Sequence, residues 1–260
     1  MRTSGIQTLP DALISLAEQQ LYVLDQDLES RVDDVPDYFR KALSPFRDNV
    51  GHRAYPCHFG RRALEQRELF VTYADRAGLP EFAASLTAFL DYARPAPDRR
   101  QVLACFVEPG AERSHDEYAA TFWDVLQWLH WHDTRPWPAG IPRDPHDPAW
   151  EFSFAGTAMF VFAAIPTHRL RRSRNLGDCL VLLFQPRNVF DGIEGGTHTG
   201  NAVRRRIRAS LAAWDVASPH PSMGDYGDPS NFEWRQYFIP DDQSDIYSTC
   251  PFRTYDDPAE

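Results

Sequence analysis

Lysine is almost absent from this sequence: 27 of its 260 residues are basic, and Lys41 is the single one that is not arginine. A P-loop nucleotide hydrolase is excluded, because its G-x-x-x-x-G-K-[ST] motif does not occur. A pyridoxal enzyme would have to form its Schiff base with Lys41, which lies in an exposed-looking Phe-Arg-Lys-Ala-Leu stretch. We therefore expect neither of these chemistries.

Long apolar runs are absent too. No segment approaches the roughly 20 apolar residues that a membrane span needs, and residues 1–10 lack the apolar core of a signal peptide. The 37 acidic residues outnumber the 27 basic ones and give a net charge of −10, which disfavours a protein that works by neutralising nucleic-acid phosphates. We expect no membrane partner, no nucleic-acid partner and a cytoplasmic location.

Several catalytic and metal-binding motifs are missing. None of the four cysteines belongs to a C-x-x-C pair, so the signatures of a zinc ribbon and of covalent c-type heme attachment are absent. The G-x-S-x-G and G-x-G-x-x-G motifs are absent as well, which removes the usual hydrolase and dinucleotide-binding signatures. Aromatic residues are plentiful, however, with 17 Phe, 10 Tyr and 7 Trp. A chain of this length and apolar content can bury a large core.

Apolar periodicity predicts strands and helices that alternate along the chain. The expected helices span residues 11–30, 35–43, 80–92, 115–131 and 201–214. The expected strands span residues 69–73, 101–107, 152–154, 159–165, 179–184 and 233–239. Hairpin signals such as Ala155-Gly156-Thr157 occur among the strands. This mixture predicts an α+β (mixed α/β) fold with a central mixed, largely antiparallel sheet flanked by helices.

The chain is expected to form one domain over residues 1–260. Its N-terminal segment, about residues 11–44, is predicted to be helical, with the second helix ending before Pro45. Residues 244–260 read as a polar tail. Ser114 and Glu117 have the spacing of a capping box, which predicts the start of the helix over 115–131.

The densest group of candidate functional residues follows the apolar strand that ends near Ile165. His168 comes first, and four arginines follow it: Arg169, Arg171, Arg172 and Arg174. An apolar wall, a neutral imidazole and several guanidinium groups suit the macrocycle, the iron and the propionates of heme. Two other interpretations remain open: a surface arginine cluster beside an ordinary histidine, and a site for phosphate or another anion.

Other side chains are alternative iron ligands. Cys57 lies beside aromatic residues, and a thiolate can ligate heme iron, although a buried neutral cysteine is the commoner arrangement. His58 follows it directly, and His220 lies in a rigid loop between Pro219 and Pro221. A hydrolytic couple of Cys57 with His58 is disfavoured, because neighbouring side chains of an extended chain point to opposite sides.

Six long motifs carry a resemblance to a known family. They are YPCHFG at 55–60, FWDVLQWLH at 122–130, WPAGIPRDPHDPAWEFSFAG at 137–156, PTHRLRRSRNLG at 166–177, FQPRNVF at 184–190 and HPSMGDYGDPSNFEWRQYF at 220–238. Through them the sequence resembles the YqcI/YcgG family over nearly the whole chain after about residue 50. That family includes heme proteins that N-hydroxylate a guanidino group.

The resemblance implies non-covalently bound heme b and the conversion of L-arginine to Nω-hydroxy-L-arginine in antibiotic (D-cycloserine) biosynthesis. The family's His-x-x-Arg-x-Ser-Arg element falls on His168, Arg171, Ser173 and Arg174, with Arg172 as a further cation. By resemblance, His168 is the expected axial ligand of the iron and the arginines are the expected partners of the propionates. The alternative ligands stay open in the order His220, His58 and Cys57.

A guanidinium substrate needs a carboxylate with bidentate geometry. Glu151, flanked by Trp150 and Phe152, is the first candidate for the catalytic and substrate-binding carboxylate, because an acidic residue in an aromatic run needs a cationic partner when it is buried. Glu233, beside Trp234, is the second. A structural ion pair is the alternative for each, and it is the favoured interpretation for Glu233.

The sequence contains no signature of a flavin, nicotinamide or iron–sulfur site. A separate electron donor is therefore expected to support the use of O2, or else peroxide serves as the oxidant. The aromatic content suggests a homodimer. A non-catalytic heme-binding carrier or sensor is the alternative from a different class of protein.

Overall fold

The computed structural model describes residues 16–75, 78–190, 192, 197–224 and 228–254. The strands are β1 Tyr22–Val23, β2 Leu69–Ala74, β3 Val102–Val107, β4 Ser153–Phe154, β5 Thr157–Ala164 and β6 Leu180–Pro186. The α-helices are α2 Leu28–Arg31, α3 Asp37–Gly51, α4 His58–Glu65, α5 Leu79–Ala93, α6 His115–Trp131 and α7 His198–Trp214. Three 3-10 helices are η1 Arg172–Arg174, η2 Arg187–Phe190 and η3 Glu233–Gln236.

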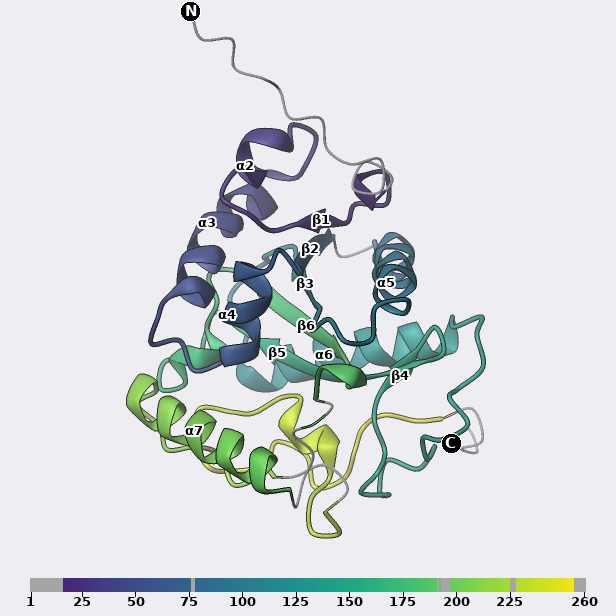
Figure 1. Cartoon of the computed structure of the whole chain (residues 1–260), viewed down its shortest axis with the longest axis vertical. Helices are drawn as coiled ribbons and strands as arrows, with labels where there is room; N and C mark the ends of the chain where they lie inside the picture. The colour runs from purple at the N-terminus through teal and green to yellow at the C-terminus, as the bar shows by residue number, and fades with distance from the viewer. Residues whose placement is uncertain (1–15, 76–77, 191, 193–196, 225–227, 255–260) are drawn as a thin grey trace, which may run out of the picture.

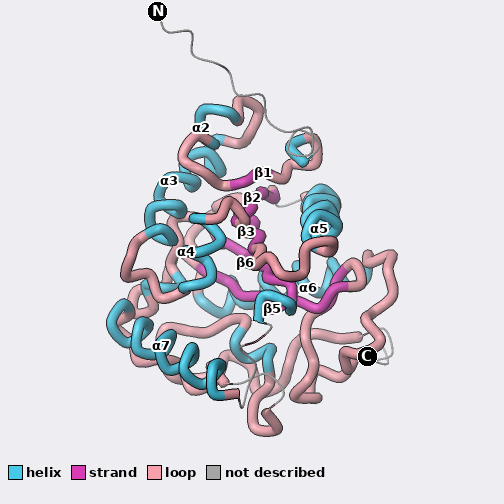
Figure 2. Tube along the Cα trace, in the orientation of Figure 1, coloured by secondary structure: helices cyan, strands magenta, loops and turns pink. Residues whose placement is uncertain are grey.

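The strands form one sheet in the order β1-β2-β3-β6-β5-β4 (Figures 1 and 2). The β2–β3 pair is parallel, because α5 carries the chain back between them, and every other pair is antiparallel. The mixed, largely antiparallel sheet of an α+β fold is therefore confirmed.

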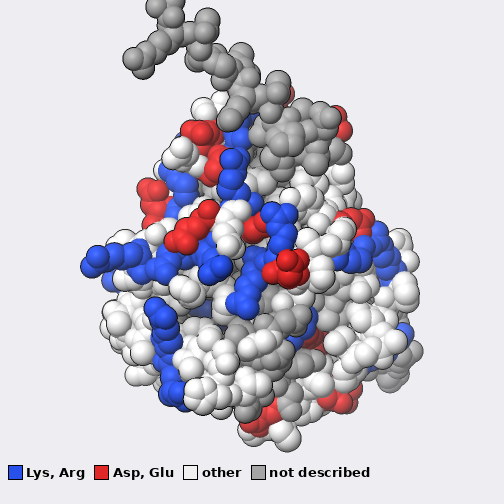
Figure 3. All heavy atoms as spheres, in the orientation of Figure 1, with Lys and Arg blue, Asp and Glu red and all other residues white. Residues whose placement is uncertain are grey.

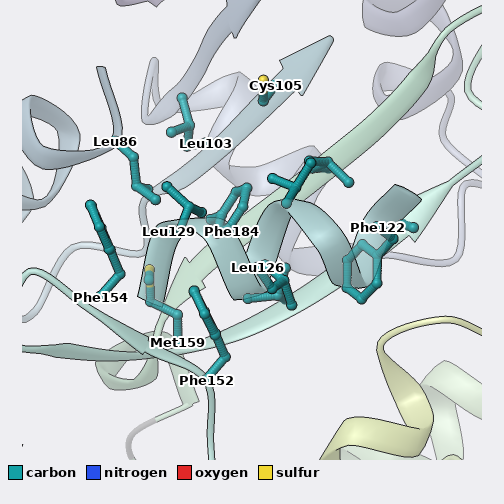
Figure 4. Close-up of a cluster of buried hydrophobic side chains, with 14 of the residues drawn as sticks. Leu86, Leu103, Cys105, Phe122, Leu126, Leu129, Phe152, Phe154, Met159 and Phe184 are labelled. Atoms are coloured by element: carbon teal, nitrogen blue, oxygen red, sulfur yellow. The ribbon is translucent and has the colours of Figure 1, made fainter. Parts of the chain in front are cut away.

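Side chains alternate between the two faces of the sheet, and each face carries a core. In β3, Leu103 and Cys105 join the core covered by α5 and α6, whereas Ala104 and Phe106 join the core covered by α3 and α4. Figure 1 shows α3 and α4 on one side of the strands and α5 on the other. Figure 4 shows the first core, in which Leu129 of α6 lies near Leu103.

Most of the central elements agree with their predicted spans. The strands that became β2, β3, β5 and β6, and the helices that became α5, α6 and α7, are all confirmed within a few residues. Ser114 and Glu117 form the expected capping box at the start of α6. The turn of the β4–β5 hairpin lies at Ala155 and Gly156. Their φ angles of 49° and 72° place both residues in the left-handed region.

The prediction of one helix over 11–30 is wrong. Residues 11–15 lie outside the described residues, and beyond them the chain turns into the edge strand β1 and reaches only the short α2. The spaced leucines do mark burial, but on two faces: Leu16 and Leu21 belong to one core and Leu24 to the other. A helix would have placed them on a single stripe.

The second helix is longer than expected. It begins at Asp37 and continues through Pro45 to Gly51. Proline in a helix interior costs about 3 kcal/mol, and here the helix continues because Phe46 and Val50 are buried on its inner face.

Two C-terminal predictions are also wrong. Residues 233–239 form no strand, and η3 takes their place at Glu233–Gln236. The described part of the supposed polar tail, residues 244–254, packs on the core through Phe252, whose ring lies 5.4 Å from that of Trp150. Residues 255–260 lie outside the described residues. Among the described helices, none combines the length and the hydropathy of a membrane span.

The core on the α3 side gives a stability prediction. Replacing Phe106 by Ala removes ring contacts with Phe39 and Phe46, at centroid distances of 5.5 and 5.1 Å. We expect the free energy of unfolding in denaturant titrations to fall by about 3–5 kcal/mol. The control Val216→Ala, at a side chain that is 72% exposed, should change it by less than about 0.5 kcal/mol.

Candidate functional site

A cavity of about 230 Å³ lies between α7 and the part of the sheet formed by β5 and β6. Its apolar wall includes the rings of Phe59, Phe160, Phe162 and Phe190. Its polar lining comes from five segments of the chain and includes Cys57, Arg174, Gln185, Arg187, Arg204, Arg208, Glu233 and Gln236. A small number of polar groups in a largely apolar cavity is typical of a small-molecule site.

Cys57 reaches the cavity from the N-terminus of α4. It caps this helix, and its Sγ accepts a hydrogen bond from the Gly60 backbone N–H at 3.3 Å. Burial raises the pKa of the Cys57 thiol, while the backbone N–H groups of Gly60 and Phe59 and the Arg174 guanidinium act in the opposite direction. A sulfur at a helix N-terminus beside a cation is well placed to become a thiolate when it binds a metal.

Glu151 and Glu233 share one cation at the inner end of the cavity. Arg187 Nη1 lies 2.5 Å from Glu151 Oε1 and 3.8 Å from Glu233 Oε1. Both carboxylates are buried, with 0% and 4% of the residue exposed. Glu151 Oε2 has no hydrogen-bond partner in the part of the chain that the structure describes.

This arrangement makes both carboxyl groups hard to ionise. Burial is the main cause that raises the pKa of Glu151 to about 7, and Arg187 opposes it. Burial, and then repulsion from Glu151, raise the pKa of Glu233 to about 8. Two carboxylates against one guanidinium leave a negative charge uncompensated when both are ionised.

His168 lies outside the lining of this cavity. The side chain is 2% exposed, and both ring nitrogens face backbone carbonyls: Nδ1 lies 2.9 Å from the Arg174 oxygen and Nε2 lies 2.8 Å from the Ile239 oxygen. Burial is the main cause that lowers the pKa of His168 to about 4. An iron ligand at this position would require one of these contacts to break.

The arginines that follow His168 are bound mainly to backbone carbonyls. Arg171 donates to the oxygens of Ser218, Pro240 and Asp242. Arg172 lies over the Trp214 ring, with Cζ 5.0 Å from its centroid.

Of this loop's predicted cofactor ligands, Arg174 alone contributes to the lining of the cavity. It donates to the backbone oxygens of Ala163 and Gln236, at 3.4 and 3.1 Å.

A carboxylate organises the same loop. Asp241 accepts hydrogen bonds from the backbone N–H groups of Arg169, Leu170 and Arg171. His115, His168 and Asp241 place a possible metal-ligand atom each within 4.8 Å of one another. Since the contacts of His168 and Asp241 already use the atoms that would bind a metal, these residues read as a structural cluster.

The remaining predicted residues lie elsewhere. His220 Nε2 lies 2.9 Å from the Ser244 oxygen, and its Nδ1 accepts from the Ser222 N–H. Trp150 is fully buried in the core beside Tyr237 and Phe252.

His58 lines a second hollow, of about 880 Å³. This hollow shares five lining residues with the cavity: Tyr55, Pro56, Phe59, Val203 and Ile207.

Sequence reasoning missed Arg187 as a functional residue. The signal was available, because Gln185 and Arg187 follow directly on the apolar run of β6 and lie in the FQPRNVF motif. The two glutamates also differ from the expectation, which ranked Glu151 before Glu233 as the substrate-binding carboxylate. Glu233 lines the cavity, whereas Glu151 lies behind it and forms the closer ion pair with Arg187.

The fold and the site define a class: an α+β protein with an apolar cavity that carries a thiol, a shared arginine and a buried carboxylate. The chain belongs to the YqcI/YcgG family, whose sequence profile matches residues 46–253.

Three relatives support this membership. "Uncharacterized protein YcgG" of Bacillus subtilis (strain 168) is 35% identical over 234 residues, which cover 86% of this chain and 92% of that protein. "Uncharacterized protein YqcI" of the same strain is 31% identical, with coverages of 87% and 92%. "Putative N(omega)-hydroxy-L-arginine synthase DcsA" of Streptomyces lavendulae is 31% identical over 228 residues, which cover 85% of this chain and 86% of that protein. No solved structure matches the chain.

The raised pKa of Glu233 predicts a pH-dependent effect of Glu233→Gln on stability. A folded-state pKa near 8 lies above the ordinary value, so the native state loses stability as pH rises from about 4.5 to 8. Glutamine removes this cost. We expect the melting temperature of the variant to match that of the wild type at pH 5 and to exceed it by a few degrees at pH 9.

Differential scanning calorimetry across this pH range checks the prediction. Glu112→Gln, at a side chain that is 77% exposed, is the matched control and should show no such trend. A constant difference between Glu233→Gln and the wild type at every pH would contradict the assignment of the raised pKa to Glu233.

Proposed function

We propose that this chain is a heme-dependent N-hydroxylase of a guanidino compound and that L-arginine is its substrate. The observation that carries the proposal is the placement of Glu233, short of positive charge, on the wall of a cavity that also holds Cys57. Similarity to a relative named as a hydroxyarginine synthase supports the choice of reaction.

The charges immediately around Glu233 favour a cationic group beside it. Arg187 lies closer to Glu151 than to Glu233, and the charges that act on the pKa of Glu233 are those of Glu151 and Arg187. A second guanidinium, brought by the substrate, would compensate the ionised Glu233 carboxylate in the same bidentate manner that arginine side chains use. A neutral ligand would leave the ionised Glu233 carboxylate without a compensating positive charge.

The donor set of the cavity fits heme. Cys57 offers a thiol that deprotonates on binding iron, four phenylalanines offer an apolar wall, and Arg174, Arg204 and Arg208 offer cations for the propionates. The volume of about 230 Å³ is below the roughly 300–1,000 Å³ of typical ligand sites. Heme binding therefore requires the cavity to widen, and the wall that it shares with the adjoining hollow is formed by residues 55–59 together with Val203 and Ile207 of α7.

When bound, heme supplies the oxygen chemistry, and the protein supplies orientation and electrostatics. Glu233 is protonated in the free protein at neutral pH, because its pKa is about 8. A guanidinium beside it lowers this pKa, so binding of the substrate expels the proton and fixes the guanidino nitrogens against the carboxylate. Arg187 holds Glu151, and Arg174 holds the Gln236 backbone in the same turn as Glu233.

The oxygen balance requires a co-reactant. With O2, one oxygen atom enters the N–H bond of the guanidino group and the other leaves as water, which consumes two electrons and two protons from a separate donor. Peroxide already carries these two electrons, so its use needs no separate electron donor. We propose one of these two oxidants for this chain.

The iron ligand can be tested by substitution. We expect Cys57→Ala, titrated with hemin, to lose the absorption and electron-paramagnetic signature of thiolate ligation. His168→Gln should keep that signature. Cys250→Ala, at a half-buried thiol outside the cavity lining, is the matched control. A wild-type spectrum of histidine ligation that is lost in His168→Gln and kept in Cys57→Ala would return the ligand to His168.

The substrate can be tested by binding and turnover. We expect L-arginine to bind more tightly as pH rises from 6.5 toward 8.5, because Glu233 must be ionised to accept the guanidinium. Isothermal titration should show this trend in the wild type, and Glu233→Gln should abolish it and weaken binding by about tenfold. Heme-loaded protein with arginine and peroxide, or with O2 and a reductant, should form a product heavier by one oxygen atom.

Two outcomes would contradict the proposal. A protein that takes up no hemin excludes the heme mechanism. A protein that takes up hemin, but whose spectrum and products do not respond to arginine or to other guanidines, is a heme carrier or sensor instead of an N-hydroxylase.

A further inference from the structure

The larger hollow, of about 880 Å³, has a lining with an unusual charge. Six arginines line it against two carboxylates: Arg53, Arg61, Arg62, Arg99, Arg100 and Arg206 against Glu68 and Asp98. The whole chain has the opposite balance, with a net charge of −10. On the face seen in Figure 3, basic atoms gather around the position of α4 and the adjacent part of α7. Such a concentration in an acidic protein marks a local site for negative charge.

Three of these arginines have no counterion among the residues that the structure describes. Arg99 is paired with the buried Glu68, and Arg61 contacts Glu65 and the Arg53 backbone oxygen. The guanidinium groups of Arg53, Arg62 and Arg206, by contrast, make no ion pair or hydrogen bond with any residue that the structure describes. Arginine is well suited to phosphate, because its planar fork binds phosphate oxygens in pairs.

The field of these arginines acts on His58, which lines the same hollow. Burial lowers the pKa of His58 first, and the positive charges of Arg61, Arg206 and Arg62 lower it further. Protonation of His58, which would add one more positive charge to the hollow, is therefore unfavourable, whereas an anion there is favoured.

The hollow also has an apolar floor. Pro56, Phe59, Val203 and Ile207 belong to its lining, and the Arg100 guanidinium lies 4.9 Å from the centroid of the Phe59 ring. Its volume is within the roughly 300–1,000 Å³ of sites that enclose small organic ligands. A concave site of this size favours a small molecule over a protein surface.

We propose that this hollow binds a small organic phosphate. Arg53, Arg62 and Arg206 would take the phosphate group, and Phe59 and Ile207 would contact the apolar part of the ligand. The site adjoins the cavity of the proposed N-hydroxylase but does not depend on heme or on a guanidine substrate.

Isothermal titration of the protein with adenosine 5′-monophosphate tests the site. This probe combines a phosphate with a flat ring, and ribose 5-phosphate and adenosine are its two halves. We expect one molecule of the monophosphate to bind per chain, more tightly than either half. Affinity should fall at higher salt, because the contacts to phosphate are ionic.

The triple variant R53Q/R62Q/R206Q should weaken binding of the monophosphate by more than about tenfold. All three side chains are exposed, so their replacement leaves the core intact. The matched control is R40Q/R113Q/R169Q, which removes the same charge at positions outside the hollow. It should bind as the wild type does. If the triple variant fails to fold, the three single variants provide the same test. Each of them should bind the monophosphate more weakly than the wild type does.

Four results would overturn the proposal. They are no binding at millimolar monophosphate, equal weakening by the two triple variants, equally tight binding of a polyglutamate peptide, and competition by hemin that requires the same three arginines. The last result would assign the hollow to the propionates of heme. Because arginine titration and product analysis do not use this ligand, failure of the proposed function would be seen separately.

Discussion

The arrangement of the cavity depends on one shared cation. Arg187 pairs closely with Glu151 and lies farther from Glu233, and Glu151 and Arg187 are the charged groups that shift the pKa of Glu233. Burial makes this imbalance costly, since a buried carboxylate is stable only when it is protonated or paired. An ionised Glu233 is therefore short of positive charge, and its raised pKa of about 8 makes its protonation depend on pH near neutrality.

The arginine-rich loop that follows β5 supports the cluster of Glu151, Arg187 and Glu233. Its guanidinium groups are bound to backbone oxygens: Arg171 to three carbonyls near residues 218–242, and Arg174 to those of Ala163 and Gln236. Gln236 belongs to the same 3-10 turn as Glu233. The loop thus connects the sheet to the turn that carries the carboxylate. Arg171 and Arg174, which are buried and bind carbonyls in this way, act as positioning residues, whereas Arg169 and Arg172 of the same motif are exposed.

The two proposed sites lie on either side of the chain segment that contains Cys57 and His58. Cys57 and His58 are neighbours in the chain, yet Cys57 lines the apolar cavity and His58 lines the arginine-rich hollow. Their side chains diverge as α4 begins, and Phe59 contributes to both linings. A small apolar wall can thereby separate a site for a cation from a site for an anion.

The amino-acid sequence was sufficient to predict the elements whose signals are local. Apolar periodicity located β2, β3, β6, α5 and α6, and the Ser114 capping box located a helix start, because these patterns depend on near neighbours. The long motifs likewise indicated the family, and the aromatic surroundings of Glu151 indicated a buried carboxylate. Three features came from tertiary contacts: the spaced leucines near the N-terminus divide between two cores, residues 244–254 cover one of these cores, and Arg187 joins Glu151 to Glu233. The two contacts of Arg187 connect residues 36 and 46 positions apart. Burial, which sets the energy of such contacts, is a property of the folded chain that no local pattern contains.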